Sequence, residues 1–167
     1  MPIRLVPLSV NDGEDVYAML QAIPVEENGF VNAMAGKSRE EFRAWLIRQE
    51  ENAKKTEIED GWRVPQAVFW LYVDGHPVGM GKLRYFLTDA LRKAGGHIGY
   101  AIAPAERGKG YGKQLLKSLL LEAKFRGIGP ALVTIHRDNG ASIATALSCG
   151  GKASDWDDER VRIWFSI

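Results

Sequence analysis

A glycine-rich segment at residues 104–116 has the residue types and spacing best suited to binding an anionic ligand. Gly108, Gly110 and Gly112 alternate with larger residues between an apolar run and an amphipathic one. Glycine has no Cβ, so the backbone here can approach a ligand closely. N–H groups in the first turn of a helix have no partner within the helix and lie at the positive end of its dipole. The basic residues of the segment are Arg107, Lys109 and Lys113. Together these features predict a pyrophosphate site.

The spacing excludes two common phosphate-binding motifs. A P-loop has Ser or Thr directly after its lysine, whereas Gln114 follows Lys113 here. A dinucleotide fingerprint needs Gly-x-Gly-x-x-Gly, and neither Gly108 nor Gly110 starts one. The sequence Arg107-Gly108-Lys109-Gly110-Tyr111-Gly112 instead resembles the Gln/Arg-x-x-Gly-x-Gly/Ala signature of the GCN5-related N-acetyltransferase (GNAT) family. The resemblance implies that these six residues and Lys113 hold the pyrophosphate of acetyl-coenzyme A. The alternative is a glycine-rich turn that binds nothing.

The resemblance also implies direct attack of an amine on a thioester, which requires a donor for the developing oxyanion. Family members use a main-chain N–H of the strand before the glycine loop, and Ile102 is the expected donor here. A backbone donor held in a sheet is preorganised for this task. The side chain of Ile102 can still be an ordinary core residue, because the prediction concerns its backbone.

Further cofactor contacts are expected on both sides of the glycine loop. Ala103 follows Ile102, and Asn139 matches a position that often touches the pantetheine or adenosine end of the cofactor in this family. Ser142 is a further predicted contact. A helix N-cap is the alternative role for Asn139, and an N-cap can also face a ligand.

One departure from the family pattern concerns the proton for the leaving thiolate. Family members often have a tyrosine seven residues after the asparagine, whereas Ala146 stands at that interval after Asn139. A thiol has a pKa near 8.5, so its thiolate can leave without full protonation. Tyr100, Cys149 and water are the remaining candidates for a proton donor, and the sequence does not choose among them.

The acceptor amine must lose a proton, and histidine suits this role because its unperturbed pKa is about 6.5. His97 lies in Gly95-Gly96-His97-Ile98-Gly99-Tyr100, which resembles an uncharacterised subgroup of acetyltransferases with the same Gly-Gly-His-Ile-Gly-Tyr run. We therefore predict catalytic roles for His97 and Tyr100, against a purely structural role for a histidine at a strand start. His136, at the end of another strand, is a second candidate.

The acceptor site is expected at two connections that commonly line it in this fold. Glu26 and Glu27 could attract a cationic amine, and Phe30 and Tyr85 could pack against its apolar part. The alternative is a solvated loop with one anchoring aromatic residue.

Composition limits the class of protein. The chain has 167 residues, 46% hydrophobic and 26% charged, which predicts one soluble domain over residues 1–167. A net charge of +1 gives no reason to expect nucleic acid or an anionic membrane as a partner. We expect no signal peptide, no membrane span and no metal site. The single cysteine, Cys149, excludes an internal disulfide, so a cytoplasmic location is expected. The resemblance also implies a possible homodimer.

Hydrophobic periodicity predicts alternating strands and helices. Strands are expected at Ile3–Leu8, Ala67–Val73, Val78–Tyr85, His97–Ala103, Ala131–His136 and Val161–Ile167. Helices are expected around Val16–Ile23, after the capping box that starts at Ser38, at Gly110–Arg126 and at Asn139–Cys149. Residues 24–37 are expected to be irregular, and residues 155–159 a charged turn. The order β-α-α-β-β-β-α-β-α-β matches the GNAT acyl-CoA N-acyltransferase fold, an α/β fold with a mixed, mostly antiparallel sheet and helices on both faces.

The sequence therefore predicts an acetyl-CoA-dependent N-acetyltransferase acting on a primary amine of a small molecule or peptide. The alternative from another functional class is a non-catalytic module of the same fold that binds or senses acyl-CoA. The departure at Ala146 keeps this alternative open.

Overall fold

The computed structural model describes residues 2–167. The strands are β1 (Ile3–Pro7), β2 (Glu26–Glu27), β3 (Phe30–Val31), β4 (Gln66–Val73), β5 (His76–Arg84), β6 (Ile98–Ile102), β7 (Ala131–His136), β8 (Lys152–Trp156) and β9 (Arg160–Phe165). The helices are α1 (Glu14–Ala22), α2 (Arg39–Asn52), α3 (Asp89–Lys93), α4 (Tyr111–Phe125) and α5 (Gly140–Ser148), with a 3-10 turn, η1, at Pro104–Glu106. None of the helices in the described residues is long and apolar enough to cross a membrane.

The strands form two antiparallel sheets and a short hairpin. One sheet has the order β1-β4-β5-β6 and the other the order β7-β9-β8, while β2 pairs with β3. The two larger sheets meet where β6 lies beside β7. Between these neighbouring edge strands the ladder of hydrogen bonds is interrupted, and this interruption is where the site forms.

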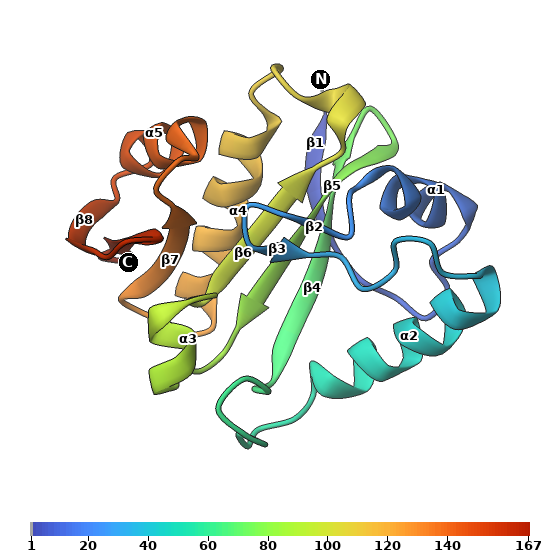
Figure 1. The fold of residues 1–167 in the computed structure, drawn as a ribbon. Coiled ribbons are helices and arrows are strands. Elements are labelled where there is room, and N and C mark those ends of the chain that lie inside the picture. Colours follow the sequence, from blue (N-terminus) through green and yellow to red (C-terminus); the bar gives the residue numbers. More distant parts are fainter. Residues whose placement is uncertain (1) are drawn as a thin grey trace.

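Helices cover both faces of the first sheet (Figure 1). Helix α4, where a helix was predicted, packs on one face through an apolar stripe of five buried residues. These are Leu115, Leu116, Leu119, Leu120 and Ala123. Helices α1 and α2 pack on the other face over a second cluster that includes Phe42, Trp45 and Trp70. The predicted capping box of α2 is also confirmed, with Ser38 and Glu41 bonding each other's backbone N–H.

Three elements differ from the sequence-based prediction. The connection after α1 contains the hairpin β2–β3, and the connection after β5 contains the short helix α3. The segment expected as a charged turn begins in β8 with Asp155 and continues beyond that strand with Asp157, and both carboxylates accept hydrogen bonds from the guanidinium of buried Arg162. Each of these elements is short and polar, so hydrophobic periodicity gives little signal for it.

Candidate active site

We call the region between β6 and β7, where the ladder of hydrogen bonds is interrupted, the fork. At one end of the fork, His97 joins the two strands. The His97 N–H donates to the Leu132 carbonyl over 2.8 Å, and the Leu132 N–H donates to His97 Nδ1 over 3.0 Å. Because Nδ1 accepts a hydrogen bond, the neutral ring carries its proton on Nε2. One residue thus joins the two sheets through its backbone and its side chain.

Gly96 allows the close approach at this point. Its φ is +61°, and a Cβ on it would lie 2.6 Å from the Leu132 carbonyl oxygen. A side chain here would therefore both strain the backbone and push the strands apart. The neighbouring Gly95 N–H donates to Thr134 Oγ1 over 2.9 Å. The Gly95-Gly96-His97 run is the closed end of the fork.

Beyond the closed end, β6 presents an open edge. The Arg84 N–H donates to the His97 carbonyl, and the Ala103 N–H donates to the Val78 carbonyl. Both hydrogen bonds join β5 to the β6 segment. Antiparallel ladders alternate, so the N–H groups of Tyr100 and Ile102 point the opposite way, toward the fork. The N–H groups of this edge are therefore not used in the ladder with β5, and one of them belongs to Ile102, whose side chain is part of the core.

The glycine loop leads from this edge into α4. Gly108 and Gly110 have φ values of +78° and +83°, and a Cβ on either would meet no atom within 4 Å. Gly110 is the N-cap of α4 and provides no side-chain hydrogen bond to the first turn. The N–H groups at the start of α4 are therefore left to bind an anion, in open space suited to a phosphate.

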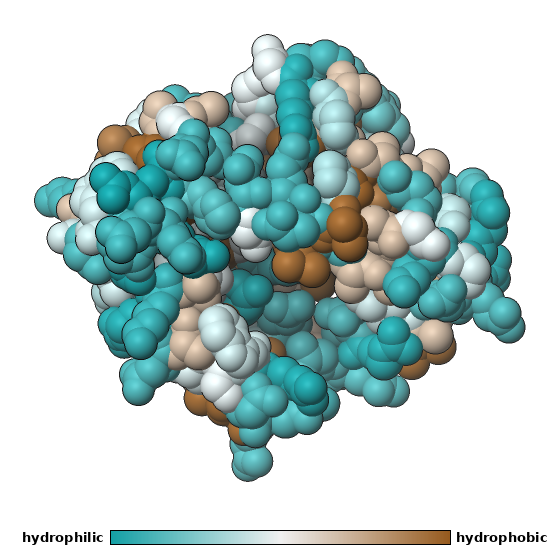
Figure 2. All heavy atoms as spheres, in the orientation of Figure 1, coloured by the Kyte–Doolittle hydropathy of each residue, from teal (hydrophilic) through white to brown (hydrophobic). Residues whose placement is uncertain are grey.

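One cavity of about 720 Å3 connects the glycine loop with the fork and the β2–β3 hairpin. The face drawn in Figure 2 is hollowed near its centre, and both hydrophilic and hydrophobic residues border the hollow. Of the predicted residues, the following line the cavity: Glu27, Phe30, Tyr100, Ile102, Arg107, Gly108, Gly110, Tyr111, Gly112, Asn139 and Ser142. We call its part formed by Gly108, Gly110, Tyr111 and Gly112 the loop end.

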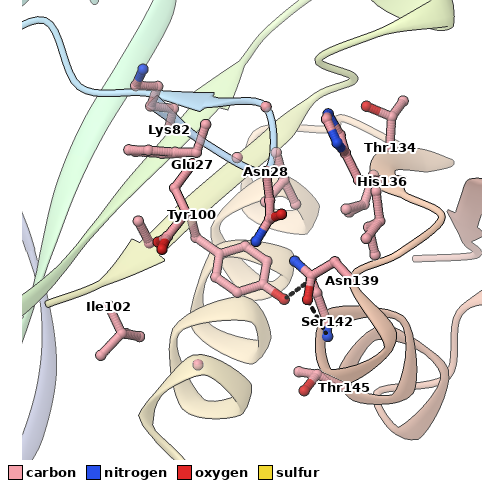
Figure 3. A pocket seen from close by; sticks show the side chains of 18 of the residues that line it. Glu27, Asn28, Lys82, Tyr100, Ile102, Thr134, His136, Asn139, Ser142 and Thr145 are labelled. Atoms are coloured by element: carbon pink, nitrogen blue, oxygen red, sulfur yellow. Dashed lines mark hydrogen bonds between the residues drawn. The ribbon is translucent and has the colours of Figure 1, made fainter. Parts of the chain in front are cut away.

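The Tyr100 phenol projects into the cavity between β6 and α5. Its oxygen lies 3.3 Å from Ser142 Oγ (Figure 3). Burial raises the pKa of the Tyr100 phenol, so the hydroxyl keeps its proton at neutral pH. Ala146, at the position where a tyrosine was expected, is fully buried. The Asn139 side chain accepts from the Ser142 N–H over 3.3 Å, so it caps α5 and faces the cavity at once.

The charged residues of the glycine loop are mostly paired within the protein. Arg107 forms a double hydrogen bond to Glu27, at 2.5 and 3.2 Å, and its Nε donates to the Ile102 carbonyl over 3.0 Å. These bonds lower the pKa of the Glu27 carboxyl. Lys109 lies 3.2 Å from Glu106. Lys109, Lys113 and Ala103 do not line the cavity. Arg107 therefore clamps the β2–β3 hairpin to the glycine loop.

Two cations at the other part of the cavity were not identified from the sequence. Lys82 and Arg84 lie two residues apart on one face of β5, and both line the cavity. We call the part formed by Phe30, Val31, Lys82, Arg84 and Gly95 the basic end. Lys82 donates to the Val31 carbonyl over 2.6 Å, and burial lowers the pKa of its ammonium to about 8. The sequence signal that could have identified these two cations was their position in a strand that is otherwise mostly apolar.

The structure places His97 outside the cavity. The residue is 7% exposed, and its side chain is bonded to Leu132 and does not line the cavity. Burial and the nearby Arg92 and Arg84 lower the pKa of His97 to about 4, so it is a poor base at neutral pH. His136, the second candidate, does line the cavity, close to Gly29 of the β2–β3 turn and 3.5 Å from Arg160.

Two residues predicted for the acceptor site also lie elsewhere. Tyr85 lines a separate hollow together with His97, and its hydroxyl donates to the Ala53 carbonyl over 2.8 Å. Strand alternation turns it to the α4 side of the sheet, away from Lys82 and Arg84. Glu26 is used within the hairpin, where Oε1 accepts from the Gly29 N–H over 2.8 Å. Within residues 2–167, no three His, Cys, Asp or Glu side chains are grouped so that they could hold a metal ion.

Comparisons with known proteins agree with this architecture. The model of the acetyltransferase (GNAT) family matches residues 33–150. The GNAT domain of S. lividans PAT is 18% identical, with a TM-score of 0.68, covering 99% of this chain and 90% of that one. A GNAT-family acetyltransferase from Streptococcus pneumoniae is 15% identical, with a TM-score of 0.66 and 99% of each chain covered.

A third structure was solved with ligands. The microcin C7 self-immunity acetyltransferase MccE, in complex with acetyl-CoA and AMP, is 17% identical, with a TM-score of 0.65, covering 99% of this chain and 92% of that one. At these identities the likeness shows the fold. A search of curated protein sequences found no match.

Proposed function

The chain belongs to the GNAT acetyltransferase family, and from this premise we propose that it transfers the acetyl group of acetyl-CoA directly to a primary amine of a small molecule or peptide. The observation that carries the proposal is that one cavity joins an open helix N-terminus, a free strand edge and a basic end. The first can bind a phosphate, the second an acyl group and the third an acceptor.

The loop end fits the pyrophosphate of the cofactor. Acetyl-CoA supplies an acetyl group activated as a thioester. Gly108 and Gly110 leave open space beside the uncapped first turn of α4, and that turn provides several N–H donors. Arg107 stays bound to Glu27 and the Ile102 carbonyl, so its proposed contribution is to shape the loop and add a positive field.

The free edge of β6 supports the reaction at the carbonyl. The Ile102 N–H is fixed by the strand and points into the fork, where it can donate to an oxyanion. Loss of one such preorganised donor costs roughly 3–4 kcal/mol in enzymes where it has been measured.

Tyr100 is the proposed proton donor to the leaving thiolate. Its hydroxyl is protonated at neutral pH, lies in the cavity and is oriented by Ser142. It reaches the side of the cavity formed by α5, the helix from which a tyrosine was expected. We propose that Tyr100 performs the role for which the Ala146 position is unsuited. His136 is the proposed acceptor of the amine proton, directly or through water.

Calorimetric titration with acetyl-CoA tests the proposal first, with dephospho-CoA and free adenine nucleotide as controls. We expect saturable one-to-one binding that depends on the pantetheine arm. Absence of binding by folded protein would mean that the glycine loop is structural, and the proposal would fail.

The alternative is a non-catalytic acyl-CoA-binding module, favoured by the alanine at position 146. Turnover with a panel of amines, corrected for thioester hydrolysis, separates the two. Binding of acetyl-CoA without acetylation of any amine would favour the module.

A further inference from the structure

We propose that the acceptor amine carries an anionic group, a carboxylate or a phosphate, and that Lys82 and Arg84 at the basic end of the cavity bind it. This inference names the substrate class and rests on the proposed function. It replaces the expectation that acidic residues attract a cationic acceptor.

The two acidic residues of the hairpin are already engaged. Glu27 is paired with Arg107 through two hydrogen bonds. Glu26 accepts from the Gly29 N–H in its own turn and does not line the cavity. Neither carboxylate is therefore available to hold an ammonium group on a substrate.

Lys82 is a cation that lacks a carboxylate partner. Its ammonium contacts the Val31 carbonyl at 2.6 Å and lies 4.5 Å from the centre of the Phe30 ring. Within residues 2–167, no Asp or Glu oxygen lies within 4.0 Å of its Nζ. A neutral carbonyl and a ring face compensate an ammonium less well than an anion does.

Arg84, two residues further along β5, is also a cation whose hydrogen-bond partners are neutral. Its Nη1 donates to the carbonyls of Gly95 and Gly96, at 3.2 and 3.4 Å, so its partners are again neutral. Across the described residues, no Asp or Glu oxygen lies within 4.0 Å of the Arg84 guanidinium. Burial lowers the pKa values of both cations, and the proximity of Arg84 adds to the effect on Lys82.

The other charged residues that line the cavity have partners of their own and do not neutralise Lys82 or Arg84. Glu106 pairs with Lys109 and His76, and Arg160 pairs with Glu159 at 2.9 Å. Two neighbouring, partly buried cations of like charge are costly to keep together, and a bound anion would relieve both the desolvation and the repulsion. Figure 3 shows Lys82 and Ser142 on opposite sides of the pocket, with Tyr100 between them. An anion at Lys82 would thus leave the fork free for the amine.

Matched acceptors test the proposal. One arm compares dipeptides that end in a carboxylate with the same dipeptides ending in a carboxamide, which barely changes the amine. The other arm compares phosphoethanolamine with ethanolamine, so the two arms distinguish a carboxylate from a phosphate. We measure kcat/KM with saturating acetyl-CoA, and also affinity for the CoA-loaded protein by calorimetry.

In at least one arm we expect the anionic member of each pair to be preferred about tenfold, because a charge-assisted hydrogen bond contributes this much. K82M should reduce the preference to below about twofold, whereas K82R should retain it because the charge is kept. K117M removes an exposed lysine of α4 outside the cavity and is the matched control, with an unchanged preference. R84M is the second test variant, with thermal unfolding as a check that each variant folds.

Two results would overturn the inference. One is a preference below about threefold in both arms, by turnover and by calorimetry. The other is a preference that persists in both K82M and R84M. Failure of the proposed function would give a different result, in which anionic ligands still bind preferentially but no amine is acetylated. Equal acetylation of anionic and neutral acceptors would leave the proposed function intact and remove the inference alone.

Discussion

The two ends of the fork between β6 and β7 differ in how their backbone groups are used. At the closed end, His97 bonds Leu132 through both its N–H and its Nδ1, and Gly95 bonds Thr134. At the open end, the N–H groups of Tyr100 and Ile102 point into the cavity, and the first turn of α4 has no side-chain cap. The same pair of strands is thus joined at one end and free at the other.

The difference shows what makes a binding cleft from a sheet edge. Unpaired backbone donors are useful only if the strands that carry them are held apart in a fixed geometry, because a mobile edge would close or collapse. The closed end supplies that fixed geometry. We therefore expect substitutions at the open end to reduce binding and catalysis, and substitutions at the closed end to reduce stability.

G110E should have the largest effect, at the open end. It places bulk and negative charge where a phosphate is expected, so acetyl-CoA affinity should fall at least about 100-fold, or about 2.7 kcal/mol. Calorimetry gives the affinity. G36E is the control, because Gly36 also has a positive φ of +75° with open space beside it but lies outside the cavity. Near-normal affinity in G110E would remove the loop end as the phosphate site.

Y100F should lower kcat about 10²-fold while leaving acetyl-CoA affinity unchanged, because it removes the proposed proton donor and little else. Steady-state kinetics and calorimetry on the same preparation separate these quantities. Y72F is the matched control, since Tyr72 is also partly buried with a raised pKa but lies outside the cavity. An unchanged kcat in Y100F would assign the proton to water or to Cys149.

H97Q tests the closed end through the pH dependence of stability. The folded pKa of His97 is about 4, below its ordinary value of 6.5, so the folded state binds this proton less readily than the unfolded state. The wild type should therefore lose up to about 3 kcal/mol of unfolding free energy through this group as the pH falls from about 6.5 to about 4. H97Q lacks this contribution, so its stability should fall less steeply over that range.

Denaturant unfolding at several pH values measures this difference, with H76Q as a control at an exposed histidine. An equal pH dependence in wild type and H97Q would contradict the structural role. The pH profile of kcat/KM should stay the same in H97Q and change in H136Q, since only His136 lines the cavity.

E27Q should have the smallest effect, because it weakens the half-exposed ion pair between Glu27 of the β2–β3 hairpin and Arg107 of the glycine loop. We expect a loss of at most about 1 kcal/mol of stability, since solvent screens such pairs. A double-mutant cycle with R107Q measures the coupling between the two residues. A coupling indistinguishable from zero would show that the pair does not hold the hairpin against the glycine loop.

Much of the fold could be predicted from the sequence. The apolar stripe Leu115–Ala123 identified α4, and the glycines before it identified the loop end, because both depend on neighbours within a few residues along the chain. Short polar elements such as the β2–β3 hairpin and α3 were not predicted, since their stability comes from packing against distant segments rather than from their own periodicity.

The sequence by itself determined the family, the fold and the position of the glycine loop, all of which follow from local spacing. Only the tertiary structure decided which titratable groups meet in the cavity. In the folded chain His97 joins two sheets, His136 lines the cavity and Glu27 is paired with Arg107. Lys82 and Arg84 have no carboxylate partner among residues 2–167. These assignments depend on contacts between residues 35 to 80 positions apart in the chain. Such contacts are set by how the sheets and helices pack, and residue type alone does not encode them.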